Sequence, residues 1–244
     1  MRNFKVLMAY KGTAYHGFQR QSNAYTIQQA VEEALTQLIG EEITIFGCSR
    51  TDAKVHARQF CFSFKTESAI PCEGIINGAN NILPNDICIL SCEQAHEDFH
   101  ARYCCKGKEY EYRILNSSMK NPFLSDSTCL IQKHIDERLL NEQAKAFVGT
   151  HDFKAFCSAD CDKENTVREI FSFNVRREGE IVIFTVSGSG FLYNMVRIMV
   201  GTLVYIGEGK IEKDSIPELL EKGDRTLAGK TLAPQGLILN RVFY

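Results

Sequence analysis

One short stretch, residues 47–59 (GCSRTDAKVHARQ), concentrates side chains that could do chemistry. It carries the carboxylate of Asp52, the imidazole of His56 and three cations. Apolar runs enclose it at residues 43–46 and 60–64, so we predict a polar loop held between two strands. Such loops often carry catalysis, because the scaffold fixes them while water and ligand still reach them. The alternative is a solvated hairpin loop in which Asp52 only caps a turn.

A second informative segment is an apolar helix predicted for residues 188–205, opened by Gly-Ser-Gly. Leucine, methionine and valine leave it little polar face, so we expect it to be deeply buried. Arg197 lies inside it, and a buried guanidinium needs a carboxylate partner because burying an unpaired charge costs too much. The partner is either structural, with Glu169 or Glu180 as candidates, or it is Asp52. In the second case the adjacent cation would keep Asp52 ionised.

A predicted strand at residues 106–115 alternates aromatic and cationic side chains, with Tyr110 and Tyr112 among Lys108 and Arg113. Aromatic rings interleaved with cations suit stacking on an unpaired base while phosphates are neutralised. Tyrosines at this spacing are more often half-buried packing residues of a sheet. The strand by itself is compatible with both interpretations, base stacking and sheet packing.

Chain length, composition and net charge limit the class of protein. The chain has 244 residues, enough for one large domain or two small ones, and 44% of them are hydrophobic. Its net charge of −2 gives no overall basic field, so nucleic-acid binding would have to depend on local cations. We find no apolar export segment and no window long enough to cross a bilayer. We therefore expect a cytoplasmic protein with no membrane partner.

The ten cysteines do not have metal-binding spacing. Cys88 and Cys92 are separated by three residues, as are Cys157 and Cys161, and no pair has the two-residue spacing of a zinc or thioredoxin-type site. Histidine partners at metal spacing are missing as well. We expect no metal, and thiols in the reduced state.

Hydrophobic periodicity predicts two similar series of elements. The first is a strand at 4–10, a helix at 27–39 capped by Thr26 and Gln29, strands at 43–46 and 60–64, a helix at 74–83 and a strand at 87–91. The second is a strand at 106–115, a helix at 136–148, a hairpin of 167–175 and 181–186, the helix reaching residue 205, a small helix at 215–222 and a strand at 237–243. Strand-helix-strand-strand-helix-strand is the split ferredoxin-like order. We predict an α+β fold of two ferredoxin-like (βαββαβ) lobes, residues 1–100 and 101–244, with antiparallel sheets and a central cleft.

Together these segments resemble the tRNA pseudouridine synthase A (TruA) family. The resemblance rests on Arg50-Thr51-Asp52 with Val55-His56-Ala57 and Gln59; Tyr10 to Thr13 with Gly17 to Gln21; Thr26-Ile27-Gln28; Phe99 to Arg102 with Lys108, Tyr110 and Tyr112; Phe191 with Asn194 to Arg197 and Val200-Gly201; and Pro234 to Leu237. A lone Arg-Thr-Asp would be weak, whereas six segments in family order over nearly the whole chain are a strong signal.

The resemblance implies an isomerase that needs no cofactor and converts uridine to pseudouridine in the tRNA anticodon stem-loop, typically at nucleotides 38 to 40. It implies a homodimer whose subunits share one tRNA. Asp52 matches the catalytic aspartate, Tyr110 the tyrosine that stacks on the flipped uracil, and Arg197 the arginine paired with the aspartate. Residues matched to substrate binding are Arg50, His56, Arg58, Gln59, Lys108 and Leu237, with Arg58 entering the RNA helix as the target nucleotide flips out.

The sequence departs from the family pattern beside the aspartate. Ser49 and Lys54 stand where the family usually has glycines, and Phe18 where tryptophan is common. Without those glycines, we expect that the backbone need not adopt positive φ there. Two rival functions remain, a non-catalytic RNA-binding protein and a cysteine-based metal or redox protein.

Overall fold

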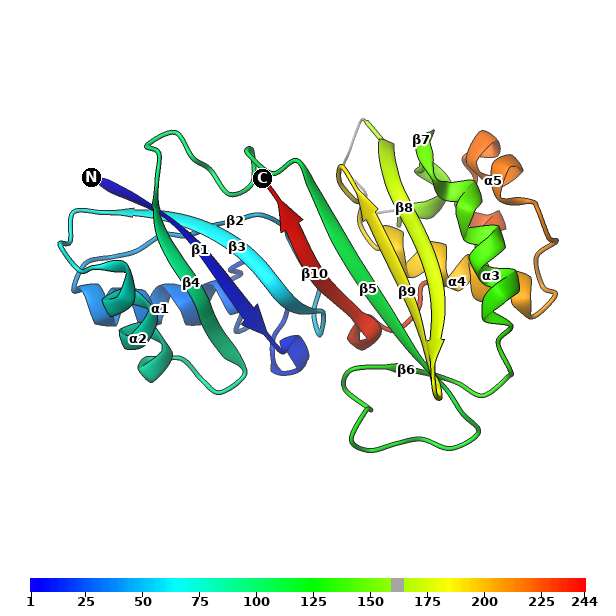
Figure 1. Cartoon of the computed structure of the whole chain (residues 1–244), viewed down its shortest axis with the longest axis horizontal. Helices are drawn as coiled ribbons and strands as arrows, with labels where there is room; N and C mark the ends of the chain where they lie inside the picture. The colour runs from blue at the N-terminus through cyan, green and yellow to red at the C-terminus, as the bar shows by residue number, and fades with distance from the viewer. Residues whose placement is uncertain (159–164) are drawn as a thin grey trace. The chain divides into compact units, whose positions relative to one another are not determined.

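The computed structural model describes residues 1–158 and 165–244 of a mixed α and β chain (Figure 1). It divides into two compact units, Met1–Lys106 with Ile238–Tyr244, and Gly107–Leu237. This differs from the expected division at residue 100. The boundary lies later, and the C-terminal strand belongs to the first unit because it pairs with a strand there.

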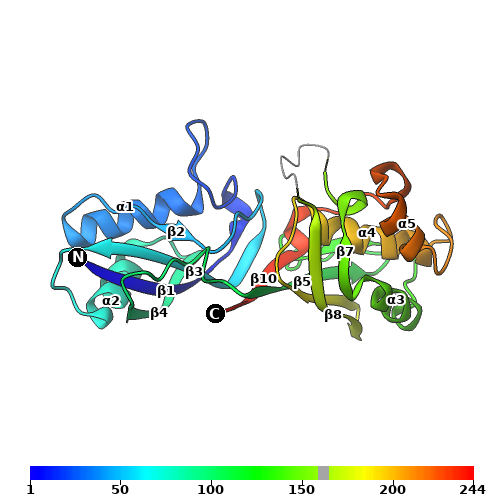
Figure 2. The same ribbon diagram turned by 90° about the horizontal axis from the view of Figure 1, so that it is seen from above.

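The first unit keeps the predicted order of elements. They are β1 (Arg2–Tyr10), α1 (Ile27–Ile39), β2 (Phe46–Gly47), β3 (His56–Thr66), α2 (Cys72–Ile82) and β4 (Ile87–Ala95), joined by β10 (Leu237–Phe243). Strand β1 lies between β4 and β3 and is antiparallel to both. On the far side of β3, β10 pairs with its beginning in parallel and β2 with its later part. Helix α1 runs along this sheet (Figure 2).

Alternation along the strands explains the core of this unit. Phe4, Val6 and Met8 of β1 are fully buried. They lie directly opposite Phe64, Phe62 and Phe60 of β3, which are buried as well. Because side chains alternate across a strand, one register places all six on the same face. The phenylalanine spacing of residues 60–64 therefore predicted this face correctly.

Helix α1 begins and ends where its capping residues predict. The Thr26 hydroxyl accepts a hydrogen bond from the Gln29 backbone N–H at 3.3 Å. Gly40 ends the helix in the left-handed conformation, with φ of 83°. The Gln29 side chain bonds to Glu33 instead of returning to the cap.

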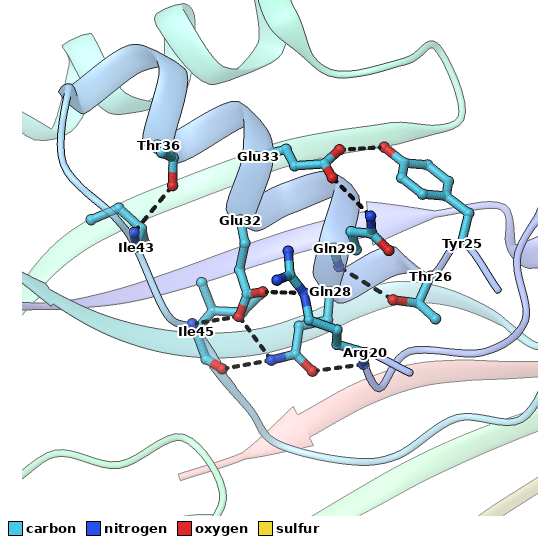
Figure 3. A network of polar contacts seen from close by, with 10 residues as sticks. All are labelled: Arg20, Tyr25, Thr26, Gln28, Gln29, Glu32, Glu33, Thr36, Ile43 and Ile45. Atoms are coloured by element: carbon cyan, nitrogen blue, oxygen red, sulfur yellow. Dashed lines mark hydrogen bonds and ion pairs between the residues drawn. The ribbon is translucent and has the colours of Figure 1, made fainter. Parts of the chain in front are cut away.

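The strand expected at residues 43–46 is wrong except for Phe46, because side chains of α1 bind the preceding backbone (Figure 3). Glu32 accepts the Ile45 N–H at 3.1 Å, and the Thr36 hydroxyl accepts the Ile43 N–H at 3.1 Å. The Ile45 carbonyl accepts a bond from Gln28 at 3.3 Å. These side chains take the place of a neighbouring strand.

Glu32 is the centre of that network, although it is only 6% exposed. Its carboxylate also meets Gln28 Nε2 at 2.8 Å and the Arg20 guanidinium at 3.1 Å. We expect Glu32→Ala to lower the free energy of unfolding by about 2 kcal/mol, since it leaves several donors without their acceptor. Urea unfolding measures this. Exposed Glu33 is the matched control, and Glu33→Ala should change stability by less than about 0.5 kcal/mol; equal losses would contradict the prediction.

The second unit contains β5 (Gly107–Asn116), β6 (Cys129–Ile131), α3 (Glu137–Ala144), β7 (Gly149–Asp152), β8 (Val167–Glu178), β9 (Ile181–Gly188), α4 (Met195–Gly207) and α5 (Ile216–Lys222). Its sheet has the order β5-β9-β8-β7, all antiparallel, and β6 is parallel to β5. The predicted β8–β9 hairpin is confirmed. The final strand expected for a second βαββαβ repeat lies in the first unit instead.

Helix α4 starts later than predicted, at Met195 and not at residues 188–190. Strand β9 continues through Gly188, and the Ser189 N–H bonds to the Glu169 carbonyl at 2.9 Å, so the Gly-Ser-Gly segment still follows the sheet. Asn194 then precedes the helix with φ of 60°. The helix itself is buried as expected, with ten of its residues inside the unit.

The cysteines correct one expectation. Eight of the cysteines in residues 1–158 and 165–244 are free, and burial raises the pKa of the Cys61 thiol to about 11. Cys157, however, is disulfide-bonded. Cys161, which the spacing argument paired with it, lies outside the described residues. The expectation that all thiols are reduced is therefore wrong for Cys157. None of the helices in residues 1–158 and 165–244 combines the length and the hydrophobicity that a membrane span requires.

Candidate active site

Asp52 opens a tight turn in the first unit. The Val55 N–H donates to the Asp52 carbonyl at 3.1 Å, so Asp52–Val55 form a β-turn, which we call the Asp52 turn. Its third residue, Lys54, has φ of 66°. The expectation that positive φ is unnecessary here is therefore wrong, because the geometry of the turn and not the residue type sets that angle. The Asp52 side chain is half-buried.

The last residue of β1 and the chain that follows it hold the Asp52 turn in place. The Tyr10 hydroxyl and the Thr51 hydroxyl are 2.7 Å apart, and Thr51 is buried. The Phe18 N–H donates to the Thr51 carbonyl at 3.0 Å, and the Lys54 N–H to the Tyr15 carbonyl at 3.3 Å. Backbone bonds on both sides of Asp52 thus limit its movement. Tyr10 and Thr51 were part of the family resemblance but were not predicted as site residues.

Two glycines allow this close approach. A Cβ atom on Gly12 would lie 2.0 Å from the Val55 carbonyl oxygen, and one on Gly17 would lie 2.7 Å from the Thr51 carbonyl oxygen. Gly17 also has φ of 88°. Any side chain at either position would therefore push the Asp52 turn away.

His56 supports the same contact. It is 5% exposed, and its Nδ1 accepts the Gly12 N–H at 3.0 Å. An accepting Nδ1 in a neutral ring leaves the proton on Nε2. The structure thus places this predicted substrate-binding residue directly after the Asp52 turn, where its ring binds the backbone of Gly12.

Residues 56–59 belong to β3, not to the predicted loop. Met8 pairs with Phe60 and Tyr10 with Ala57, so two residues of β3 lie opposite one residue of β1. This β-bulge leaves Arg58 and Gln59 both exposed, although neighbours on a regular strand face opposite sides. Arg58 donates to the Asn240 side chain of β10 at 3.0 Å. Arg50, before Asp52, is exposed as well.

The predicted site tyrosine lies on β5 of the second unit. Tyr110 is 6% exposed and packs edge-to-face on Phe191, with ring centres 5.1 Å apart. Tyr112 is fully buried, and its hydroxyl donates to the Ala233 carbonyl at 2.7 Å. Burial raises the pKa of Tyr112 well above its ordinary value, so its phenol stays protonated. Lys108 is half-buried two residues before Tyr110.

Arg197 is half-buried rather than deeply buried, because α4 begins at Met195 and places it in the first turn. A cation there is opposed by the helix dipole. Its Nε donates to the Leu232 carbonyl at 2.7 Å and its Nη1 to the Asn194 side chain. Glu169 and Glu180 are exposed, so neither is the buried structural partner considered for it.

Asn194 and Leu237 complete the second unit's candidate residues. Asn194 also donates to the Ser158 hydroxyl at 2.8 Å, so it orients Arg197 from a fixed position. Its positive φ is a conformation that asparagine tolerates better than most residues, which is a signal the sequence carried. Leu237 is 7% exposed at the start of β10.

The similarity of this protein to known proteins extends over the whole chain. Residues 6–104 and 143–244 match a family model described as tRNA pseudouridine synthase. The chain is 42% identical over 245 residues to the tRNA pseudouridine synthase A of Ruminiclostridium cellulolyticum. It is 43% identical over 244 residues to the enzymes of that name from Acetivibrio thermocellus and Geotalea uraniireducens. All three alignments cover 100% of both chains.

Proposed function

Since the chain belongs to the tRNA pseudouridine synthase family and isomerises uridine to pseudouridine in tRNA, we propose that Asp52 is its catalytic carboxylate. The observation that carries this is the Asp52 turn. Tyr10, Phe18 and Tyr15 hold its backbone through contacts to Thr51 and Lys54, while the Asp52 side chain remains half-buried. A fixed carboxylate that a substrate can still reach suits covalent or electrostatic catalysis.

The isomerisation moves one bond and one proton. The glycosidic bond from uracil N1 to ribose C1′ breaks, the base rotates, and C5 forms a new bond to C1′. C5 then loses its proton, and N1 gains one. Asp52 either attacks the ribose or the base, or stabilises the positive charge that develops on the ribose. All these roles require the ionised carboxylate.

Two residues of the second unit are proposed to complete the chemistry. Arg197 pairs with Asp52 and keeps it ionised, since an adjacent cation lowers the pKa of a carboxylate. The contacts of Arg197 to Leu232 and Asn194 support this role, because they restrain its guanidinium. Tyr110 stacks on the flipped uracil and serves the proton transfer at C5. Its packing against Phe191 supports a fixed ring position.

The other predicted residues are proposed to bind the substrate. Arg50 and Gln59 contact the RNA, and Arg58 fills the space left by the flipped nucleotide, which offsets part of an unstacking cost of a few kcal/mol. Their exposure supports such contacts. Lys108 and Leu237 border the base, and His56 contributes by positioning the Asp52 turn.

We further propose the finer assignments that follow from the resemblance. The targets are nucleotides 38 to 40 of the anticodon stem-loop, and two copies of the chain bind one tRNA. The enzyme needs no cofactor and works in the cytoplasm, where tRNA is modified. The first unit is a ferredoxin-like lobe that borders a central cleft, and its β-α-β-β-α-β order supports this.

An unmodified tRNA transcript tests the proposal. We expect the purified protein to form pseudouridine at positions 38 to 40 in the presence of a chelator and without added nucleotide. Chemical mapping of pseudouridine provides the readout, and a transcript with cytidines at those positions is the control. Binding without product would favour the non-catalytic RNA-binding rival. Loss of activity on chelation, with bound metal by elemental analysis, would favour the metal-protein rival.

A further inference from the structure

Lys54 occupies a turn position that favours glycine. A turn with positive φ at its third residue is normally built with glycine or asparagine there. In the Asp52 turn that residue is Lys54, with φ of 66°. A lysine in this conformation is less stable than glycine, because its Cβ crowds the following carbonyl group.

The neighbours of the turn prevent this strain from relaxing. The Lys54 N–H is bound to the Tyr15 carbonyl at 3.3 Å. Gly12 packs so closely that its Cβ position lies 2.0 Å from the Val55 carbonyl oxygen. A change of φ at Lys54 would break the hydrogen bond to Tyr15 or make the Val55 carbonyl collide with Gly12. The backbone therefore imposes the left-handed conformation on whichever residue stands there.

The side chain of Lys54 gives the turn no compensating contact within the described parts of the chain. It is exposed, and no hydrogen bond or ion pair holds it among those residues. Strain that persists without a structural benefit is most often found where a side chain serves function. Lys54 stands two residues after Asp52, the proposed catalytic carboxylate.

We propose that Lys54 binds a phosphate of the tRNA strand beside the target nucleotide. This inference rests on the proposed function of Asp52. The chain has a net charge of −2, so attraction to a polyanion must come from local cations. Arg50, Lys54 and Arg58 are all exposed and flank Asp52 on both sides. A lysine suits this contact because it binds phosphate as a flexible point charge.

Three variants separate the charge from the backbone strain. Lys54→Gln removes the charge and keeps the strain, Lys54→Arg keeps both, and Lys54→Gly removes both. Lys65→Gln is the matched control, because Lys65 is an exposed lysine farther along β3, about 30 Å from His56. Dissociation constants for an unmodified tRNA transcript are measured between 50 and 300 mM salt, and thermal midpoints are measured without RNA.

Lys54→Gln and Lys54→Gly should each weaken tRNA binding about fivefold at 0.1 M salt and reduce the slope of log K against log salt by about 0.7 to 0.9. Lys54→Arg and Lys65→Gln should bind like the wild type. Lys54→Gly alone should raise the thermal midpoint, by about 2 °C. Lys54→Gly should therefore change stability and tRNA affinity in opposite directions: the variant is more stable than the wild type but binds tRNA more weakly.

This inference is overturned if the Lys54→Gln variant binds tRNA with unchanged affinity and unchanged salt slope while the wild-type protein forms pseudouridine. A Lys54→Gly protein with no gain in thermal midpoint would overturn the claim of strain. Failure of the proposed function is a different result, since the wild-type protein would then bind tRNA without forming pseudouridine.

Discussion

Asp52→Asn should abolish pseudouridine formation, with a rate at least about 10⁴-fold below that of the wild type. An amide has nearly the same shape as a carboxylate but no charge, so it neither attacks the ribose or base nor stabilises a positive ribose. The bonds that form the Asp52 turn use the backbone of Asp52 and Val55, so the variant should keep its fold. Single-turnover assays at saturating tRNA measure the rate, and unfolding in urea checks stability.

Asp86 provides a matched control for this change. It is a half-buried aspartate of the same unit, and it accepts the Tyr15 hydroxyl at 2.7 Å. An asparagine can still accept that bond, so Asp86→Asn should keep activity within about threefold of the wild type. If Asp52→Asn kept full turnover, or if both variants lost activity equally, Asp52 would not be the catalytic carboxylate.

Gly12→Ala is expected to have the second-largest effect, although Gly12 carries no side chain. The added methyl group would lie 2.0 Å from the Val55 carbonyl oxygen, far inside contact distance, so the Asp52 turn has to move. A displacement of about 1 Å at a catalytic group costs on the order of 10²-fold in rate. The clash should also lower the free energy of unfolding by about 3 kcal/mol.

Gly179→Ala separates collision from other effects of replacing glycine. Gly179 has φ of 59° in the β8–β9 hairpin, and nothing lies within 4 Å of its Cβ position. Its replacement should cost about 1 kcal/mol through the backbone alone and leave activity unchanged. Equal loss of activity in the two alanine variants would show that Gly12 does not position the turn.

Local patterns in the sequence predicted most elements of the first unit. The capping of α1 by Thr26 depends on residues three apart, and the phenylalanines of β3 alternate with a period of two. Such signals involve near neighbours, so they hold whatever the rest of the chain does. Asp52 and Arg197 were singled out in the same way, as charges in unusual surroundings. Their pairing stays a prediction.

Other features depend on residues far apart in the sequence. Residues 43–45 have the apolar pattern of a strand, but Glu32 and Thr36 accept their backbone N–H groups in place of a neighbouring strand. The bulge that exposes Arg58 and Gln59 together arises from the register of β3 against β1. No property of residues 56–60 alone reveals it.

The residues around Asp52 thus determined by themselves where chemistry is concentrated, because charges enclosed by apolar runs are a local signal. Only the tertiary structure decided the conformation of that stretch. Gly12 and Tyr15 lie about 40 residues away in the sequence. Gly12 packs against the Val55 carbonyl and Tyr15 accepts the Lys54 N–H, and these contacts hold Lys54 at positive φ. Backbone angles respond to contacts from the whole fold, whereas residue type sets only a preference.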